Sequence, residues 1–312
     1  MRFWKNSAAS LAAFFCAAMM ASAESAWKHT YADVNGVRLH YVEQGKGTLI
    51  LFLHGFPEFW YAWTPLLAEF GRDYHAVALD MRGYNLSAKP EAVDAYRIPV
   101  IVEDVRVLAA KLDARKFVLV GHDWGGVIAW AFAAQHPEML GKLVIINAPH
   151  PTVFARELAQ NPDQQKASSY FNLFNSPQAE QALSANEFSG LFQAFGSALN
   201  AEDRKEYLAA WKQPGGLTGG LNYYRAAQLR SPAGAPPGAQ APALQPLAPI
   251  TTPTLVIWGE KDTALLTGNL EGLDQYVKPL AIRRIPDGSH WVVHEKPGLV
   301  IHYVRDFLKS SR

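Results

Sequence analysis

The sequence predicts an α/β fold in which helices cover both faces of a mostly parallel sheet, with a helical segment inserted between two strands. Short, wholly apolar runs alternate along the chain with helix-forming stretches. Apolar runs of this kind are typical of parallel strands buried on both faces, and strand–helix alternation is typical of parallel sheets. The alternation stops between about Pro151 and Pro253, where the chain is first aromatic and helix-like and then rich in Pro, Ala and Gly.

The first 23 residues have the order of a secretory signal. Arg2 and Lys5 precede an apolar run at 8–20, and Ala21-Ser22-Ala23 follows. The run is shorter than the apolar segment that a transmembrane helix needs. The alternative to a cleaved signal is an uncleaved membrane anchor. Cleavage after Ala23 would remove Cys16, the one cysteine, and with it any disulfide or thiol chemistry. We therefore expect a periplasmic or secreted protein without a stable membrane anchor.

Charge excludes some partners, and length limits the number of domains. The formal net charge of +1 becomes −1 once Arg2 and Lys5 are removed, and no basic run is present. Nucleic acid and anionic membranes are therefore not expected as partners. The remaining length suits one large α/β domain with an insertion. The expected division is a first core part at 24–150, a helical cap with a Pro/Ala-rich return linker at 151–245, and a second core part at 246–312.

The strands begin with a hairpin at 31–41, where Asn35-Gly36 is the signal of a type I′ turn. The core strands expected after it are apolar and lie between helical stretches. They are 49–53, 76–79, 117–120, 143–146, 254–258 and 281–285.

The segment Gly121-His122-Asp123-Trp124-Gly125-Gly126 lies between the strand at 117–120 and an apolar helix at 127–134. Strand, glycine-rich turn and buried helix form a nucleophile elbow, which exposes one side chain. That side chain is usually Ser, and here it is Asp123. A carboxylate attacking an acyl carbon would give a high-energy anhydride, whereas attack on a saturated carbon gives an alkyl ester that water can cleave. With a reference pKa near 3.9, Asp123 is expected to be ionised at neutral pH.

Other candidate site residues follow other strands. His54-Gly55-Phe56-Pro57 follows the first core strand, so the backbone N–H groups of Phe56 and Trp124 could hold an oxyanion. Asp262 and His290 follow the last two strands, and the order nucleophile, acid, histidine is that of the α/β-hydrolase triad. His290, held by Asp262, is the expected base for water, since its reference pKa near 6.5 suits proton abstraction at neutral pH.

No metal or other cofactor is expected. His294 lies four residues after His290, a spacing that can chelate zinc on a helix. The stretch His-Trp-Val-Val-His nevertheless lacks the glutamate of the HExxH motif, and no third ligand is evident.

At this point the chain resembles the epoxide hydrolase branch of the α/β-hydrolase superfamily over nearly all of its mature length. The motifs are His54-Gly-Phe-Pro-Glu-Phe-Trp60, Asp80-Met-Arg-Gly-Tyr84, the elbow at 121–126 and the stretches around Asp262 and His290-Trp291. The resemblance implies the α/β-hydrolase fold with an inserted helical cap. It also implies an epoxide hydrolase that uses Asp123, Asp262 and His290 to form a vicinal diol through an aspartyl ester.

In that family two cap tyrosines hold the epoxide oxygen, and the resemblance assigns these roles to Tyr170 and Tyr224. Because neighbours on a helix point about 100° apart, Tyr223 and Tyr224 cannot both face one pocket, and the family pattern favours Tyr224. Two departures are Asn85, where the family often has Gly, and Asn147, where some relatives place their acid. The second departure directs the acid role to Asp262.

Two alternatives remain. A haloalkane or haloacid dehalogenase has nearly the same core, and Trp124 fits its halide-binding position. A halide leaves without a proton and needs only N–H donors, whereas an epoxide oxygen needs an acidic O–H. An exported binding protein without turnover is the second alternative, and the complete triad argues against it. The expected partners are a small apolar epoxide and water; the sequence does not name the epoxide or the oligomeric state.

Overall fold

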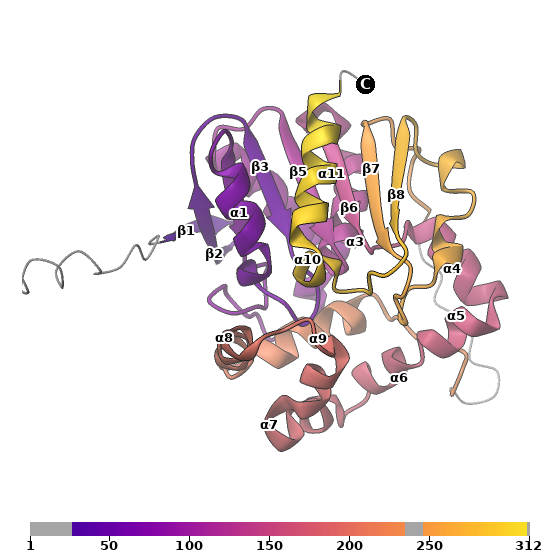
Figure 1. The fold of residues 1–312 in the computed structure, drawn as a ribbon. Helices are drawn as coiled ribbons and strands as arrows, with labels where there is room; N and C mark the ends of the chain where they lie inside the picture. The colour runs from indigo at the N-terminus through magenta and orange to yellow at the C-terminus, as the bar shows by residue number, and fades with distance from the viewer. Residues whose placement is uncertain (1–26, 235–245, 311–312) are drawn as a thin grey trace, which may run out of the picture.

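The computed structural model describes residues 27–234 and 246–310. Within them, eight strands form one sheet in the order β1-β2-β4-β3-β5-β6-β7-β8 (Figure 1). The pairs β1–β2 and β2–β4 are antiparallel, and every other neighbouring pair is parallel. The predicted α/β class with a mostly parallel sheet is therefore confirmed.

The strands begin or end a few residues away from the apolar runs in the sequence, because backbone pairing continues past the last apolar side chain. Their bounds are β1 Lys28–Val34, β2 Val37–Gln44, β3 Leu49–Leu53, β4 His75–Leu79, β5 Phe117–His122, β6 Leu140–Ile146, β7 Thr254–Gly259 and β8 Leu280–Ile285. The predicted hairpin turn is present, since Asn35 and Gly36 have φ angles of 45° and 78°.

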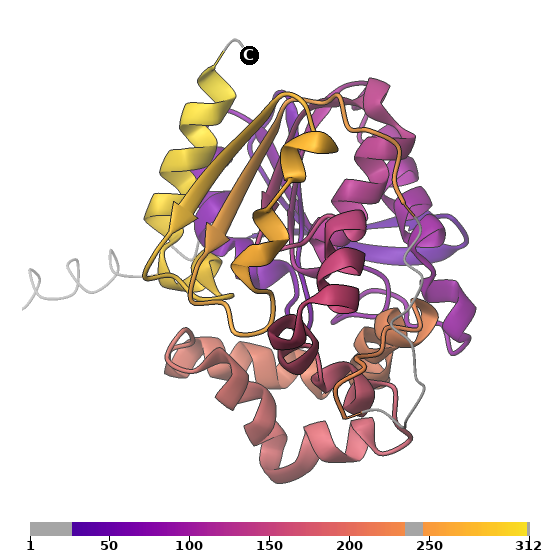
Figure 2. The same ribbon diagram turned by 90° about the vertical axis from the view of Figure 1, so that its right-hand side faces the viewer.

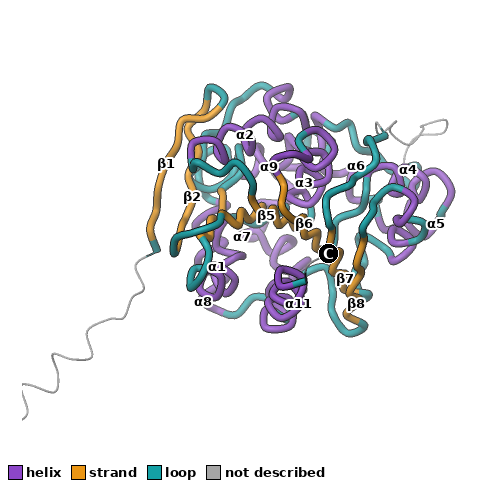
Figure 3. The backbone as a smooth tube through the Cα atoms, turned by 90° about the horizontal axis from the view of Figure 1, so that it is seen from above, coloured by secondary structure: helices purple, strands orange, loops and turns teal. Residues whose placement is uncertain are grey.

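Helices cover both faces of the sheet. Viewed from above, α1 (Thr64–Phe70) and α11 (Pro297–Lys309) lie on one side, and α2 (Ile98–Lys111) and α3 (Trp124–Gln135) lie on the other (Figure 3). A short helix, α10 (Val292–Glu295), precedes α11. Short 3₁₀ helices occur at Trp60–Trp63, Val93–Tyr96, Pro137–Met139, Thr267–Leu270 and Leu273–Gln275.

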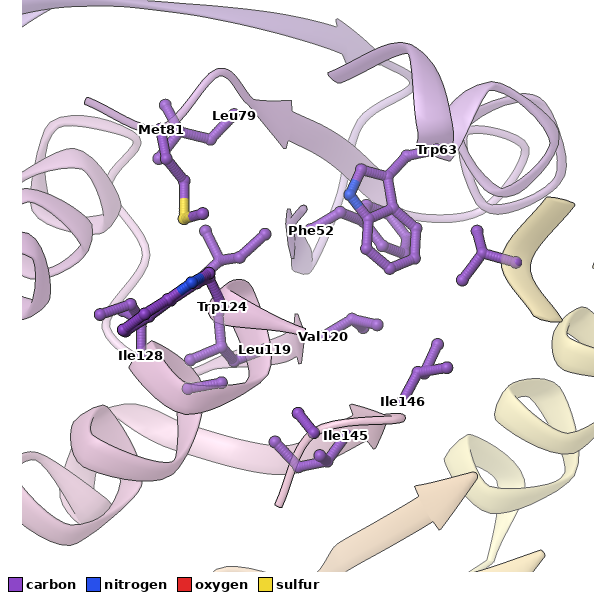
Figure 4. Packing of buried hydrophobic residues seen from close by; sticks show 14 of the residues in the cluster. Phe52, Trp63, Leu79, Met81, Leu119, Val120, Trp124, Ile128, Ile145 and Ile146 are labelled. Carbon is purple, nitrogen blue, oxygen red and sulfur yellow. The ribbon is translucent and has the colours of Figure 1, made fainter. Parts of the chain in front are cut away.

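The core lies between the sheet and these helices. Phe52 and Trp63 pack against each other with ring centroids 5.1 Å apart, and Leu119, Ile128 and Ile145 are also fully buried (Figure 4). Burial of one such side chain contributes about 1.5–3 kcal/mol. This packing fixes the strand ends that carry the candidate site residues.

Six of the described helices lie between β6 and β7 and gather at the lower end of the sheet (Figures 1 and 2). They are α4 Pro151–Gln160, α5 Pro162–Ala167, α6 Tyr170–Phe174, α7 Ala179–Phe195, α8 Ala201–Trp211 and α9 Gly216–Ala226. The predicted signal at 1–23 and residues 235–245 of the predicted Pro/Ala-rich linker lie outside the described residues. None of the helices described is long and apolar enough to cross a membrane.

Candidate active site

Asp123 occupies the tight turn between β5 and α3. Its φ of 51° and ψ of −119° are costly for a residue with a side chain, and strain of this kind gathers at functional sites. The turn needs glycine on both sides. A Cβ on Gly125 would lie 2.1 Å from the carbonyl oxygen of Leu53, and one on Gly121 would lie 2.3 Å from that of Gly125. The sequence therefore turns sharply here and exposes the carboxylate above the ends of the strands.

Two backbone N–H groups hold the carboxylate of Asp123. Oδ1 accepts a hydrogen bond of 2.8 Å from the N–H of Phe56, and the N–H of Trp124 also donates to the carboxylate. Burial raises the pKa of Asp123 above its usual value, while His290 and these N–H groups act in the opposite direction. The two donors expected to form an oxyanion hole are thus directed at the carboxylate of the nucleophile itself.

Asp262 and His290 lie at the ends of β7 and β8, beside Asp123. His290 Nδ1 lies 2.7 Å from Asp262 Oδ2, and His290 Nε2 lies 3.7 Å from Asp123 Oδ2. Asp262 Oδ1 also accepts hydrogen bonds from the N–H groups of Ala264 and Leu265, at 2.8 and 2.9 Å. Burial opposes ionisation of Asp262, but His290 and these donors together lower its pKa. The structure therefore brings the three predicted residues together in the predicted order.

The pKa of His290 differs from the sequence-based expectation. Burial acts to lower it, but Asp262 and then Asp123 outweigh burial and raise the pKa to about 9. The expectation near 6.5 considered the imidazole alone, whereas two carboxylates flank it in the fold. His290 is therefore protonated at neutral pH, and its positive charge favours the ionised form of Asp123.

Asn147, at the end of β6, is a polar contact of the site that sequence reasoning did not assign. Its side-chain Nδ2 donates to Asp262 Oδ2 at 2.8 Å, and its Oδ1 accepts from the N–H of Gly259 at 2.9 Å. Its φ of 39° is a conformation that Asn tolerates better than most residues. Asn147 thus holds the acid rather than replacing it. Asn85, the other departure, also has a positive φ, 41°, which Asn tolerates in place of Gly.

Tyr170 and Tyr224 both line a cavity of about 350 Å³ that contains Asp123. Their ring centroids lie 6.3 Å apart, with an interplanar angle of 79°. Burial, followed by the charge of Asp123, raises the pKa of both phenols well above the usual value. Both side chains are therefore neutral O–H donors at any physiological pH.

The neighbouring Tyr223 points elsewhere, as the helical geometry requires. Its hydroxyl donates to the carbonyl oxygen of Arg82 at 2.8 Å, outside the cavity. Helix α9 can approach this loop because Gly219 and Gly83 are in contact. A Cβ on Gly219 would lie 2.2 Å from the Gly83 carbonyl oxygen. This close approach fixes which of the two tyrosines faces Asp123.

A buried polar cluster lies beneath the catalytic groups and was also missed. Glu58 Oε2 lies 2.7 Å from His122 Nδ1, and Glu58 Oε1 lies 2.7 Å from His294 Nε2. His122 Nε2 in turn lies 2.9 Å from the backbone oxygen of His290, and Tyr207 of the inserted helices contacts His294. Burial opposes ionisation of Glu58, but the two imidazoles hold its pKa well below its usual range. His294 thus pairs with a carboxylate, and among the described residues no cluster suits a metal ion.

An exposed nucleophile on a strained elbow, with an acid and a histidine at two further strand ends, defines an α/β-hydrolase. A family model of the alpha/beta hydrolase fold matches residues 48–297. The chain is 37% identical over 302 residues to epoxide hydrolase 4 of Mus musculus, covering 91% of this chain and 80% of that protein. It is also 37% identical over 293 residues to the AB hydrolase superfamily protein YfhM of Bacillus subtilis, covering 91% and 99%.

Solved structures give the same result. An epoxide hydrolase of Bacillus megaterium in complex with an inhibitor superimposes with a TM-score of 0.83 at 38% identity, covering 90% of this chain and all of that one. An epoxide hydrolase from metagenomes of hot environments matches with a TM-score of 0.82 at 35% identity, covering 92% and 99%. The chain therefore belongs to the epoxide hydrolase family of the α/β-hydrolases, as the sequence motifs indicated.

Proposed function

We propose that this protein hydrolyses a small apolar epoxide to a vicinal diol through an ester on Asp123. The observation that carries the proposal is the position of the Asp123 carboxylate. The N–H of Phe56 holds Oδ1, while Oδ2 lies beside His290 in a cavity that two phenols share. A nucleophile, a base for water and proton donors for the leaving oxygen are thus within one site.

In the first step, Asp123 Oδ2 attacks one epoxide carbon, and the C–O bond to that carbon breaks. The electron pair goes to the epoxide oxygen, which takes a proton from Tyr170 or Tyr224. A phenol can supply this proton because an alkoxide is a stronger base than a phenolate. The product of the step is an alkyl ester of Asp123 and a tyrosinate.

Formation of the ester also changes His290. The charge of Asp123, one of the causes of its raised pKa, disappears when the carboxylate becomes an ester. The proton of His290 is then free to move to the tyrosinate. This leaves a neutral imidazole and a restored phenol, so alkylation itself converts His290 into a base.

In the second step, His290 Nε2 takes a proton from a water molecule as its oxygen attacks Cγ of Asp123. Negative charge develops on Oδ1, toward which the N–H of Phe56 already points, and the N–H of Trp124 is a second donor to the same carboxylate group. The Cγ–Oδ2 bond then breaks, and the leaving oxygen takes the proton of His290. The diol departs with Oδ2, and the acid that remains returns its proton to His290.

A single turnover in ¹⁸O-labelled water tests this sequence of bonds. The label is expected in the Asp123 side chain, measured by mass spectrometry of the peptide that contains it, while the first diol carries no label. A diol labelled in that turnover, with an unlabelled Asp123, would mean that water attacks the epoxide directly. Asp123→Asn is expected to abolish steady turnover, which also opposes a binding-only role.

The dehalogenase alternative requires a free N–H donor for the halide. The indole of Trp124, which fits that position, packs edge-on against the ring of Tyr224, with centroids 5.1 Å apart. The site thus has a phenol beside the indole, and an O–H donor is what an epoxide oxygen needs and a halide does not. Halide release from haloalkanes without diol formation from any epoxide would reverse that conclusion.

We also propose export to the periplasm or beyond, on the basis of residues 1–23 alone. The N-terminal sequence of the protein recovered from cells is expected to begin at Glu24. An N-terminus that retains Arg2 and Lys5 in a cytoplasmic fraction would contradict export.

A further inference from the structure

The cavity is long, and the reacting carboxylate lies at its inner end. One face of α3 forms a wall, contributing Trp124, Val127, Ala131 and Gln135 at helical spacing. At 1.5 Å per residue, the 12 positions from Asp123 to Gln135 span about 18 Å. The lining includes neither His290 nor Phe56, which surround Asp123 on its other sides. This cavity therefore extends from the nucleophile along α3.

The other end of the cavity is its mouth. Of the lining residues, only Arg97, Pro99 and Gln135 are exposed, whereas Phe171 and Leu265, near the nucleophile, are buried. The middle of the cavity is lined by aliphatic, aromatic and proline side chains. A substrate that fills it must therefore present an apolar chain along most of its length.

The two ends carry opposite charges. Arg97 is the one basic residue in the lining, and its side chain makes no hydrogen bond or ion pair with any described residue. Asp123 at the inner end repels an anion and Arg97 at the mouth attracts one. An amphiphilic anion would thus enter with its apolar end first.

We propose that the substrate is a terminal epoxide on a long unbranched chain whose other end carries a carboxylate, with Arg97 as the residue that recognises this group. The proposal rests on the proposed function. An extended chain advances about 1.2 Å per bond, so 18 Å accommodates roughly 12 to 15 carbon atoms. The cavity volume agrees, because about 350 Å³ holds about a dozen groups the size of a water molecule. Because this cavity extends from Asp123 along α3, the proposal assigns the epoxide to the end of the chain rather than to its middle.

A series of terminal epoxides from four to sixteen carbons, each with a methyl or a carboxylate end, tests the proposal. The kcat/KM of the purified enzyme is expected to rise about threefold to fourfold per added methylene and to level off once the chain reaches the mouth. Equal activity at every length, or a preference for mid-chain epoxides, would overturn the proposal while leaving epoxide hydrolysis intact. Diol formation from none of them, nor from aromatic epoxides, would instead refute the proposed function.

Variants of Ala131 test the dependence on chain length, and variants of Arg97 test the dependence on charge. Ala131→Phe would fill the cavity about 12 Å along α3 from Asp123, so the optimum is expected to move to chains several carbons shorter. Ala131→Leu, a smaller change, is expected to move it less. An unchanged optimum in folded variants would contradict the assigned path.

Arg97→Ala is expected to lower the ratio of kcat/KM between carboxylate-ended and methyl-ended substrates by about twofold to fivefold, because exposed ion pairs are weak. Arg97→Glu should lower it further, and high salt should have the same effect. The matched control is Arg115→Ala, an exposed arginine outside the lining, which should leave the ratio unchanged. A ratio that is the same in the wild type, Arg97→Ala and Arg97→Glu would refute the role of Arg97.

Discussion

The proton affinity of His290 should depend on the charge of Asp123, and neutralising Asp123 tests this directly. Nε2 lies 3.7 Å from Oδ2 of Asp123. At an effective dielectric constant near 20, two unit charges about 4 Å apart attract by about 4 kcal/mol. This energy corresponds to a change of up to about 1000-fold in the acid dissociation constant. In Asp123→Asn the pKa of His290 should therefore fall well below its value of about 9 in the wild type.

The assay is a pH titration of the His290 ring followed by NMR of histidine-labelled protein, with the His290→Gln spectrum used to assign the signal. Asp123→Ala, which has no amide, should lower the midpoint in the same direction. If His290 titrates at the same or a higher pH in both Asp123 variants, ester formation does not convert it into a base, and the order of proton transfers is wrong.

Three further outcomes are expected. In His290→Gln the ester on Asp123 should accumulate, because no base activates the water. Intact mass spectrometry should then show the mass of the protein plus one epoxide. Turnover by this variant without such an adduct would contradict the role of His290. Tyr170→Phe and Tyr224→Phe should each slow the alkylation step about 100-fold in rapid-mixing experiments, since a general acid contributes at least that factor. If either variant alkylates at the wild-type rate, the tyrosine it lacks is not a proton donor. Arg82→Ala should lower the free energy of unfolding, measured in urea, by about 3–5 kcal/mol. The substitution leaves the buried Asp104 carboxylate, 2.6 Å from the guanidinium in the wild type, without its ion pair. A decrease below about 1 kcal/mol would contradict this expectation.

Much of the site could be predicted from the sequence because parallel strands place their carboxyl ends at one edge. Asp123, Asp262 and His290 each follow an apolar run, and the topology alone brings them close together. Local chemistry predicted the turns equally well, since Asn35-Gly36 and the glycines of the elbow permit few other conformations. These features depend on neighbours in the chain.

The contacts that the sequence did not predict join residues far apart in the chain. Glu58 is 64 positions from His122 and 236 from His294, and no periodic pattern marks such pairs. Asn147 was noted as a departure, but its contact with Asp262 depends on the register between β6 and β7. The raised pKa of His290 had the same origin, because it depends on distances between charges that only the fold defines. These contacts and this pKa shift therefore depend on burial and on pairing between distant residues, which the sequence motifs do not specify.

The hydrogen bonds from the Phe56 and Trp124 amides to the Asp123 carboxylate have a consequence for selectivity between bond types. When a carboxylic ester or amide enters the site, no free pair of N–H donors is available to polarise its carbonyl group. Both N–H groups already donate to the Asp123 carboxylate in the resting protein. Saturated electrophiles need no such polarisation and are not penalised. In Asp123→Ser the side chain would be shorter, and the two N–H groups would be free to bind the carbonyl oxygen of a substrate. A single substitution therefore separates a site suited to opening epoxides from one suited to cleaving acyl bonds.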